Sequence, residues 1–289
     1  MVSVGNPYVL SPAQYRTIKK TALDIIRNKT VGRKLLPLDP EASPGTQEME
    51  STKYIKPESN AKIIAKGGEY DIFEPTEQKS RVKIRKLGKA FVVTDEDLDT
   101  SRATGKGLDK RGIELATEMI VEDEESFIFS GYAPMNEPGL VDLVPEENKV
   151  DALAPWDTDM LEPYEDFRKT IGVLSENNFV PKVAVFNNKD FANIFKEDSF
   201  GKTYFNKLVE NFSISKDNYL MTTGMPSGSI LLMDIGPQIA DFKEVERVNP
   251  RDPVRDTRDR QQINVREQIG KEVYRPEALA LIENMMTEE

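Results

Sequence analysis

Apolar residues recur at helical spacing shortly after the N-terminus. Ser11 is suited to cap a helix, Pro12 to occupy its first position and Gln14 to complete a capping box. The apolar residues that follow share one face, while the lysines and arginines lie mostly elsewhere. That face consists of Tyr15, Ile18, Ala22, Ile25 and Ile26. We predict an amphipathic, basic helix that ends near Asn28 and packs on the protein's own core.

Helical spacing returns in the second third of the chain. Residues 108–129 keep Ile113, Ala116, Ile120 and Phe127 on one face, which predicts a long helix after a loop at residues 100–107. The helix contains an acidic run, residues 122–125. Because consecutive side chains on a helix point in different directions, we expect solvated or ion-paired carboxylates rather than a calcium or magnesium site. Further helices are predicted at residues 160–174, 191–195 and 204–212.

Short apolar runs between turn signals predict strands. They lie at residues 62–65, 81–85, 90–94, 183–186, 229–233, 239–248 and 261–268. Between residues 160 and 233 strands alternate with helices, which indicates a mixed α/β unit. Residues 35–60 hold four prolines and few periodic apolar positions, so we expect an extended arm there.

Residues 81–85 alternate basic and apolar side chains. As a strand, this segment would have one wholly basic face and one thin apolar face. An isolated ribbon is marginally stable in water. We therefore expect it to lie on the body of its own subunit or to reach onto a neighbouring one.

Charge is distributed unevenly along the 289 residues. The formal net charge of -11 argues against nucleic-acid binding over the whole surface. Residues 1–34 nevertheless hold seven basic residues and one acidic residue, and residues 79–94 hold six basic residues and no acidic one. This polarity suggests surfaces that meet different partners, and the alternative is that these segments are simply solvated faces.

Histidine and cysteine are both absent. This excludes Ser-His-Asp and Cys-His nucleophiles, zinc sites of cysteine and histidine, and disulfides. No glycine-rich phosphate loop occurs. We expect no catalytic residue, no metal and no cofactor, with a carboxylate-based hydrolase as an outsider. No apolar run approaches the roughly 18 residues of a membrane span, and no secretory signal opens the chain. We therefore expect a cytoplasmic protein that does not enter a membrane.

Several short motifs stand in a recognisable order. The most specific is the capped start Leu10–Tyr15 followed by Gly32–Leu35, which reads Gly-Arg-Lys-Leu. The others are Phe91–Thr94 with the acids after it, Glu122–Gly131, Pro138–Leu140 and Tyr274–Leu279. Together they resemble the encapsulins, shell proteins that share the Hong Kong 97 phage capsid fold. The stretch after Leu35 and the longer arginine-rich loop at residues 249–260 depart from the family's pattern.

The resemblance implies an α+β, Hong Kong 97 phage capsid-like fold in four parts. These are an N-terminal helix and arm (1–45), an extended loop with a β-ribbon (46–94), a peripheral domain with a spine helix (95–136 and 235–289) and an axial α/β domain (137–234). In this family the loop lies on adjacent subunits. The inter-subunit candidates are therefore Lys79, Arg81, Lys83, Arg85 and Lys86.

The implied function is structural. Many copies would close into an icosahedral nanocompartment in the cytoplasm, with a cargo protein in its lumen. Encapsulin cargo docks by short tails against the opening helix and the peripheral domain. Carried over by position, the docking candidates are Tyr15, Ile18, Ala22, Ile25, Ile26, Arg33, Leu35, Tyr274 and Ala278. The alternative for these side chains is that they fill the core.

The rival interpretation is a major capsid protein of a double-stranded DNA virus or provirus. It would place the chain in a virion around packaged DNA. The basic N-terminal segment suits DNA if it faces the lumen, whereas the encapsulin-like opening helix favours the nanocompartment.

Overall fold

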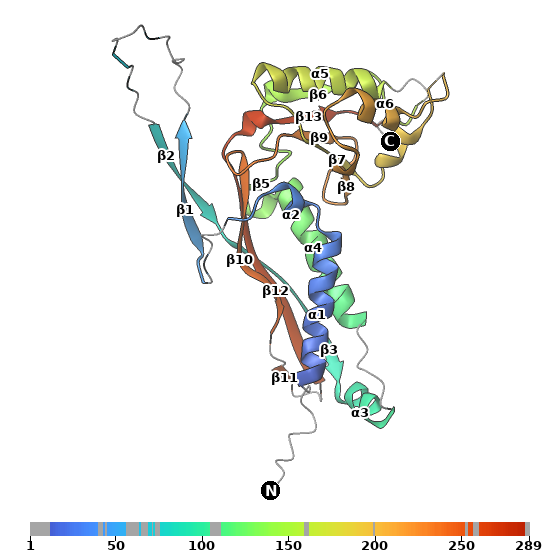
Figure 1. The fold of residues 1–289 in the computed structure, drawn as a ribbon. Coiled ribbons are helices and arrows are strands. Elements are labelled where there is room, and N and C mark those ends of the chain that lie inside the picture. The colour runs from blue at the N-terminus through green and yellow to red at the C-terminus, as the bar shows by residue number, and fades with distance from the viewer. Residues whose placement is uncertain are drawn as a thin grey trace.

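The computed structural model describes residues 12–39, 43, 45–55, 64, 69, 70, 72, 76–104, 111–158, 162–198, 200–251, 254–256 and 260–286. The described chain is an α+β fold with three parts (Figure 1). A long sheet is backed by two helices, a head contains a second sheet covered by helices, and a ribbon projects sideways from the body.

Two long helices lie side by side along the long sheet (Figure 1). They are α1 (Pro12–Lys29) and α4 (Arg111–Phe129), and both confirm predicted helices. A short helix, α2 (Gly32–Leu35), follows α1 and leads into the arm. The arm then runs beside the long sheet and is described below with the pocket that it lines.

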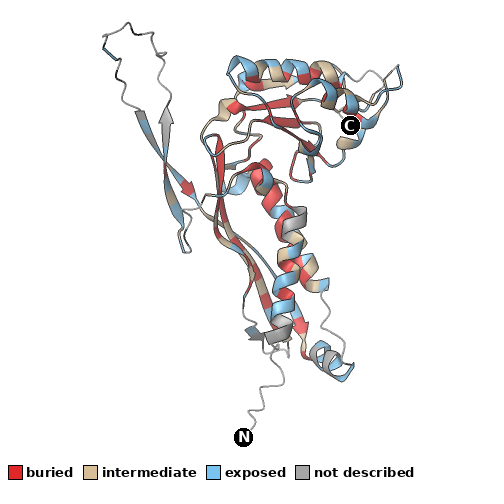
Figure 2. Ribbon diagram, in the orientation of Figure 1, coloured by how far each residue is buried: buried red, intermediate tan, exposed pale blue. Residues whose placement is uncertain are grey.

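The long sheet has β12 (Arg260–Val273) at its centre. β3 (Arg85–Thr94) pairs antiparallel with one edge of β12, while β10 (Ala240–Pro250) and β11 (Val254–Asp256) pair antiparallel with the other. The face toward the two long helices is apolar, and Figure 2 shows this buried seam. One cluster in the seam joins Ile18 and Ala22 of α1 to Val93, Ile113 and Ile263. The strands predicted in these regions are confirmed, and β12 extends beyond its predicted end.

The ribbon consists of β1 (Glu48–Ile55) and β2 (Thr76–Lys83), paired antiparallel. Among its described residues, burial is concentrated near the base (Figure 2). There Val82 and Ile84 lie over Gly270 of β12, where a Cβ would come within 2.9 Å of Cδ1 of Ile84. The base of the ribbon thus rests on its own subunit, while the rest projects away from the body (Figure 1).

The head contains a five-stranded mixed sheet in the order β6, β13, β9, β7, β8. The strands are β6 (Lys149–Asp151), β7 (Val183–Asn187), β8 (Tyr219–Thr222), β9 (Ile230–Met233) and β13 (Leu279–Glu283). Val183 and Val185 face a core shared with α4, whereas Ala184 and Phe186 face a second core under α5 and α6. Those helices span Pro163–Glu176 and Tyr204–Asn211. Because both faces are covered, β7 and β9 read as continuous apolar runs.

Short elements connect these parts. They are β4 (Gly131–Tyr132), β5 (Glu137–Pro138) and the 3-10 helices η1 (Ala133–Met135), η2 (Glu146–Asn148), η3 (Phe191–Phe195), η4 (Lys216–Asn218) and η5 (Pro276–Ala278). The helix predicted at residues 191–195 is this 3-10 segment. The strand predicted at residues 62–65 lies outside the described residues apart from Ile64.

One expectation about the chain after β3 is wrong. Residues 95–104 form helix α3 (Asp95–Thr104), whereas the sequence predicted a loop that begins at residue 100. Thr94 and Asp97 form a capping box: Oγ1 of Thr94 accepts from the amide of Asp97 at 3.2 Å, and Oδ2 of Asp97 accepts from the amide of Thr94 at 3.2 Å. The helix has no apolar stripe, so periodicity did not reveal it.

Strand pairing crosses two of the expected domain boundaries. β3, expected in the extended loop, pairs with β12 of the long sheet along its whole length. β13, expected in the peripheral domain, pairs with β9 and β6 in the head. The division into four parts stays a prediction.

Candidate functional site

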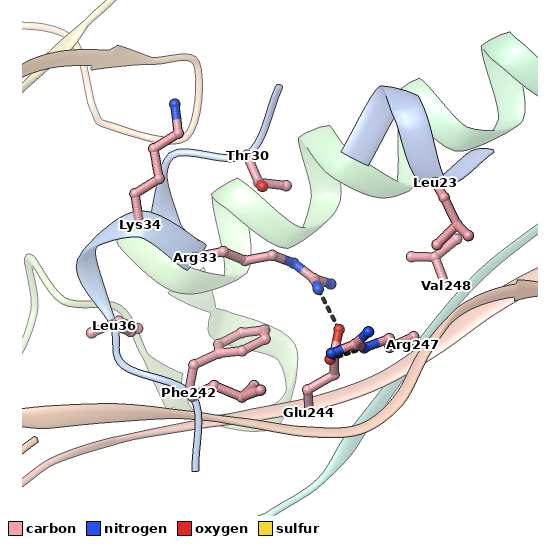
Figure 3. A pocket seen from close by; sticks show the side chains of 10 residues that line it. Leu23, Thr30, Arg33, Lys34, Leu36, Phe242, Glu244, Arg247 and Val248 are labelled. Carbon is pink, nitrogen blue, oxygen red and sulfur yellow. Dashed lines mark hydrogen bonds and ion pairs between the residues drawn. The ribbon is translucent and has the colours of Figure 1, made fainter. Parts of the chain in front are cut away.

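A pocket of about 420 Å³ lies between α1, α2, the arm and β10 (Figure 3). Leu36, Phe242 and Val248 line it and are almost fully buried, whereas Leu38 is 51% exposed. Three cations and one carboxylate also line it. The complete lining is Leu23, Thr30, Arg33, Lys34, Leu36, Leu38, Phe242, Glu244, Arg247 and Val248. The pocket therefore combines aliphatic and aromatic surface with a charged margin.

Backbone pairing holds the arm along β10. The amide of Phe242 donates to the carbonyl of Pro37 at 2.8 Å, and the amide of Asp39 donates to the carbonyl of Phe242 at 2.9 Å. Leu38 and Phe242 thereby form an isolated parallel bridge. This pairing brings apolar residues from opposite ends of the chain into one pocket.

A buried carboxylate of α4 fixes the start of α2. Oε1 of Glu125 accepts from the amides of Val31 and Gly32, each at 2.8 Å, and Oε2 accepts from Oγ1 of Thr222 at 2.7 Å. Burial raises the pKa of Glu125, and these hydrogen bonds oppose the shift. Gly32 leaves no room for a side chain, because a Cβ would overlap Cδ1 of Ile128. α2 therefore sits in a defined position on α4.

Beneath the pocket, Arg33 contacts three glutamates from three elements. Its Nε and Nη2 donate to the two oxygens of Glu124 at 2.6 and 3.1 Å, and Nη2 also donates to Glu267 at 2.9 Å. Nη1 donates to Glu244, as Figure 3 shows. The guanidinium carbon lies 5.3 Å from the centroid of the Phe242 ring. Arg33 thus joins α2 to α4, β10 and β12.

Burial and charge oppose one another in this cluster. Burial raises the pKa of Glu124, against the hydrogen bonds and charge of Arg33. It raises the pKa of Glu267 further, because that carboxyl group is fully buried and the charge of Glu124 adds to the shift. Burial alone would lower the pKa of Arg33, but its carboxylate neighbours raise it. The arginine therefore stays charged, whereas burial destabilises the ionised forms of Glu124 and Glu267.

The predicted docking residues divide between this pocket and the cores. Arg33 lines the pocket, and it alone does so among the seven candidates whose side chains the structure describes. Four others have exposed fractions of 3% or less: Ile18, Ala22, Leu35 and Ala278. Ile18 and Ala22 pack in the seam between α1 and the long sheet, while Leu35 and Ala278 pack in the large core near α4. In the single chain these four present almost no surface.

Four docking candidates remain. Ile25 is half-buried, and the side chains of Tyr15 and Ile26 lie outside the described residues. Tyr274 lines a separate pocket of about 260 Å³ at the base of the ribbon, where its hydroxyl donates to Asp241.

Sequence reasoning missed most of the residues that line the pocket. Phe242 and Val248 lie on a strand that the sequence predicted, but nothing local indicates that they face the arm. Leu36 and Leu38 stand among prolines without periodicity. The signal that could have found them is the adjacent motif at residues 32–35, which places Arg33 beside them.

The ribbon cations do not form a wholly basic surface. On one face of β2 the structure places Lys79, Arg81 and Lys83, and the register sets Thr52, Glu50 and Glu48 of β1 opposite them. Nη2 of Arg81 lies 3.6 Å from Oε1 of Glu50. The face predicted as basic is therefore mixed in charge, because β1 contributes acidic residues to it. The sequence did not predict β1 as a strand.

The two other ribbon candidates belong to the long sheet. Arg85 and Lys86 begin β3 rather than continue β2. Arg85 pairs with Glu137, and Lys86 is exposed.

In the described residues, no helix has the length and apolar character to cross a membrane. The same part of the chain contains no group of three acidic, histidine or cysteine side chains arranged to hold a metal ion.

Comparisons with known proteins point to one family. Residues 8–241 match the model of the Linocin M18 family, described as encapsulating protein for peroxidase. No curated protein sequence matches the chain.

Several solved structures have a similar fold. A virus-like particle from Pyrococcus furiosus is 19% identical, with a TM-score of 0.63 over 94% of this chain and 99% of that chain. The capsid of Myoviridae phage XM1 is 12% identical, with a TM-score of 0.62 over 86% and 89%. A structure from Microbacterium phage Oxtober96 is 10% identical, with a TM-score of 0.66 over 88% and 91%.

The likeness to these particles and capsids confirms the predicted Hong Kong 97 phage capsid-like fold. The family match covers most of the length of the sequence. The chain therefore belongs to the family of encapsulating proteins for peroxidase, whose members are structural shell proteins.

Proposed function

We propose that copies of this chain assemble in the cytoplasm into a closed icosahedral shell around a cargo protein, and that the subunit itself performs no chemistry. The family match over residues 8–241 carries this proposal. The described ribbon supports it, because most of β1 and β2 projects beyond the body that stabilises its base (Figure 1). A two-stranded ribbon is marginal in water, and a neighbouring subunit would cover it.

Electron microscopy of the purified full chain tests the shell. We expect uniform closed particles, with a mass many times that of the 289-residue subunit in size-exclusion chromatography with light scattering. A protein that stays monomeric under all assembly conditions contradicts the proposal.

We further propose that the pocket between α2 and β10 receives a short cargo tail. Its volume of about 420 Å³ lies within the usual range for small binding sites. Its apolar lining suits one or two aliphatic side chains. Lys34 and Arg247 at its margin suit a carboxylate on the same tail. The family's description makes a peroxidase our preferred cargo.

A loading experiment tests the pocket. The probe is a fluorescent protein fused to the C-terminal tail of a peroxidase from the same genome, co-expressed with the chain. We expect Leu38→Asp to abolish co-sedimentation of the probe with particles, because Leu38 lines the pocket and is 51% exposed. Leu153→Asp is the control, since Leu153 is 50% exposed in the head. Equal loading by both variants contradicts docking at this pocket.

The viral capsid remains the second candidate. It is favoured by the phage capsids of similar fold and by three exposed cations on α1: Arg16, Lys19 and Lys20. Such cations suit packaged DNA. Nuclease-treated particles distinguish the two functions. We expect particles without DNA, and protected double-stranded DNA would favour the capsid.

A further inference from the structure

A turn in the head presents a phenylalanine to solvent. It connects η3 to α6 and projects from the head (Figure 1). Phe200 in this turn is 88% exposed, so its ring does not add to the stability of the single chain through burial. The proposed cargo pocket, at α2 and β10, lies in a different part of the molecule. The pocket therefore does not account for the exposed ring, which the structure presents on a separate, anchored turn.

The turn that carries Phe200 is held by one carboxylate. Oδ1 of Asp198 accepts from the amides of Phe200 and Lys202, at 2.8 and 2.9 Å. The amide of Asp198 donates to the carbonyl of Lys202 at 2.9 Å, and Gly201 supplies the left-handed backbone with φ +75°. Lys207 of α6 forms an ion pair with Asp198. Asp198 thus holds the amides of Phe200 and Lys202 in place before any partner binds.

The base of the turn is also anchored. Glu197 and Thr203 form an antiparallel bridge, and Nζ of Lys196 donates to the carbonyl of Trp156 at 2.9 Å. Beneath it, Phe195 and Phe205 pack with ring centroids 5.1 Å apart. On a held backbone, a phenylalanine has only two side-chain torsions to order on binding, which suits an interface anchor.

The charge around the turn indicates what binds there. Residues 196–210 contain three lysines and three acidic residues, so this segment is neutral in a chain of net charge -11. Because each copy has a net charge of -11, two copies repel each other overall, and a neutral segment adds nothing to that repulsion when it lies at their contact. A strongly basic partner would instead favour the acidic remainder.

We propose that Phe200 is a self-association anchor that inserts into an apolar surface of a second copy of this chain. The inference rests on the proposed shell, because closed assemblies repeat one heterologous contact many times. A phenylalanine ring contributes roughly 150–250 Å² of buried surface to each such contact. The effect of one residue is therefore multiplied around the particle.

The test uses the full chain, dissociated and then reassembled, with light scattering to find the concentration at which particles form. We expect Phe200→Ala to raise that concentration by about tenfold or more, and Phe200→Leu to restore part of the loss. Val180→Ala is the matched control, because Val180 is 54% exposed in the head but outside the turn. We expect it to assemble like the unaltered chain.

A second variant tests the fixed turn. Asp198→Ala removes the acceptor of two amides but keeps Phe200, so we expect it to weaken assembly as well, with an unchanged far-ultraviolet circular dichroism spectrum. Phe200→Ala particles that form at the unaltered concentration overturn the inference and leave the shell intact. If the unaltered chain forms no particles, the shell proposal fails. Sedimentation then tests whether Phe200→Ala weakens self-association, and no self-association at all overturns the inference too.

Discussion

Two glycines illustrate how local space decides the effect of a single methyl group. At Gly32 an added Cβ would overlap Cδ1 of Ile128, which has no exposed surface. At Gly172, on the exposed side of α5, nothing lies within 4 Å. We expect Gly32→Ala to lower the free energy of unfolding by about 1–3 kcal/mol. Gly172→Ala should raise it by about 0.5–1 kcal/mol. Urea unfolding measures both, and a harmless Gly32→Ala would contradict tight packing of α2 on α4.

The buried acids around Arg33 make stability depend on pH. The pKa values of Glu124 and Glu267 are raised in the folded chain above an ordinary value of 4.5. Such a group contributes stability fully below its unfolded pKa and loses it as the pH rises through the folded pKa. The free energy of unfolding should therefore fall from about pH 4.5 upward, by at most about 1.4 kcal/mol per pH unit for each proton released.

Glu267→Gln isolates that dependence. Glutamine resembles the protonated acid and can still accept a hydrogen bond from Arg33. We expect the variant to lose stability less steeply than the unaltered chain as the pH rises above the ordinary glutamate pKa of 4.5. Urea unfolding at several pH values gives the slopes. Glu96→Gln, on the exposed start of α3, serves as the control. Identical slopes for Glu267→Gln and the unaltered chain would show that Glu267 does not titrate there.

At the scale of elements, the apolar pattern predicted the helices and strands that bury apolar residues and missed the polar elements α3 and β1. α1 and α4 follow from helical spacing because each buries one face, whereas the head strands β7 and β9 follow from continuous apolar runs because both of their faces are buried. α3 has no such face, and β1 was hidden in a polar arm whose partner strand begins more than 20 residues later. Arg33 could be identified from its motif. The pocket beside it could not, because Leu38 meets Phe242 only through pairing between distant parts of the chain.

The ribbon's contact with the long sheet is the element most open to a direct test. Gly270 lies under Val82 and Ile84, so Gly270→Val should displace the base of the ribbon. We expect faster amide hydrogen exchange in β1 and β2, by about tenfold or more, because this contact supports them. Ala90→Val adds a β-branched residue at an exposed position of the same sheet and should leave exchange unchanged. Unchanged exchange in Gly270→Val would mean that the ribbon does not depend on this contact.

At the scale of the whole molecule, composition limits how a shell of these subunits could respond to its surroundings. The chain has no histidine, whose ordinary pKa would suit a switch near neutral pH, and no cysteine for a redox staple. A pH response would have to come from buried groups whose pKa values are shifted, such as Glu267, whose pKa burial raises, or Lys271, whose pKa burial lowers to about 8. The cluster around Arg33 joins α2 to α4, β10 and β12. Protonation of its carboxylates would therefore first affect how α2 is held on these elements.

The net charge of -11 also predicts how salt affects assembly. Copies of one acidic chain repel each other, and the range of that repulsion falls from about 30 Å at 10 mM salt to about 8 Å at 150 mM. We therefore expect particles to form at lower protein concentration in 150 mM than in 10 mM sodium chloride (about the ionic strengths compared above), measured by light scattering. At pH 5, where fewer carboxylates are ionised, the same change in salt should matter less. The opposite dependence on salt would mean that ion pairs across subunit contacts, such as those available to the mixed-charge ribbon, outweigh the repulsion between whole subunits.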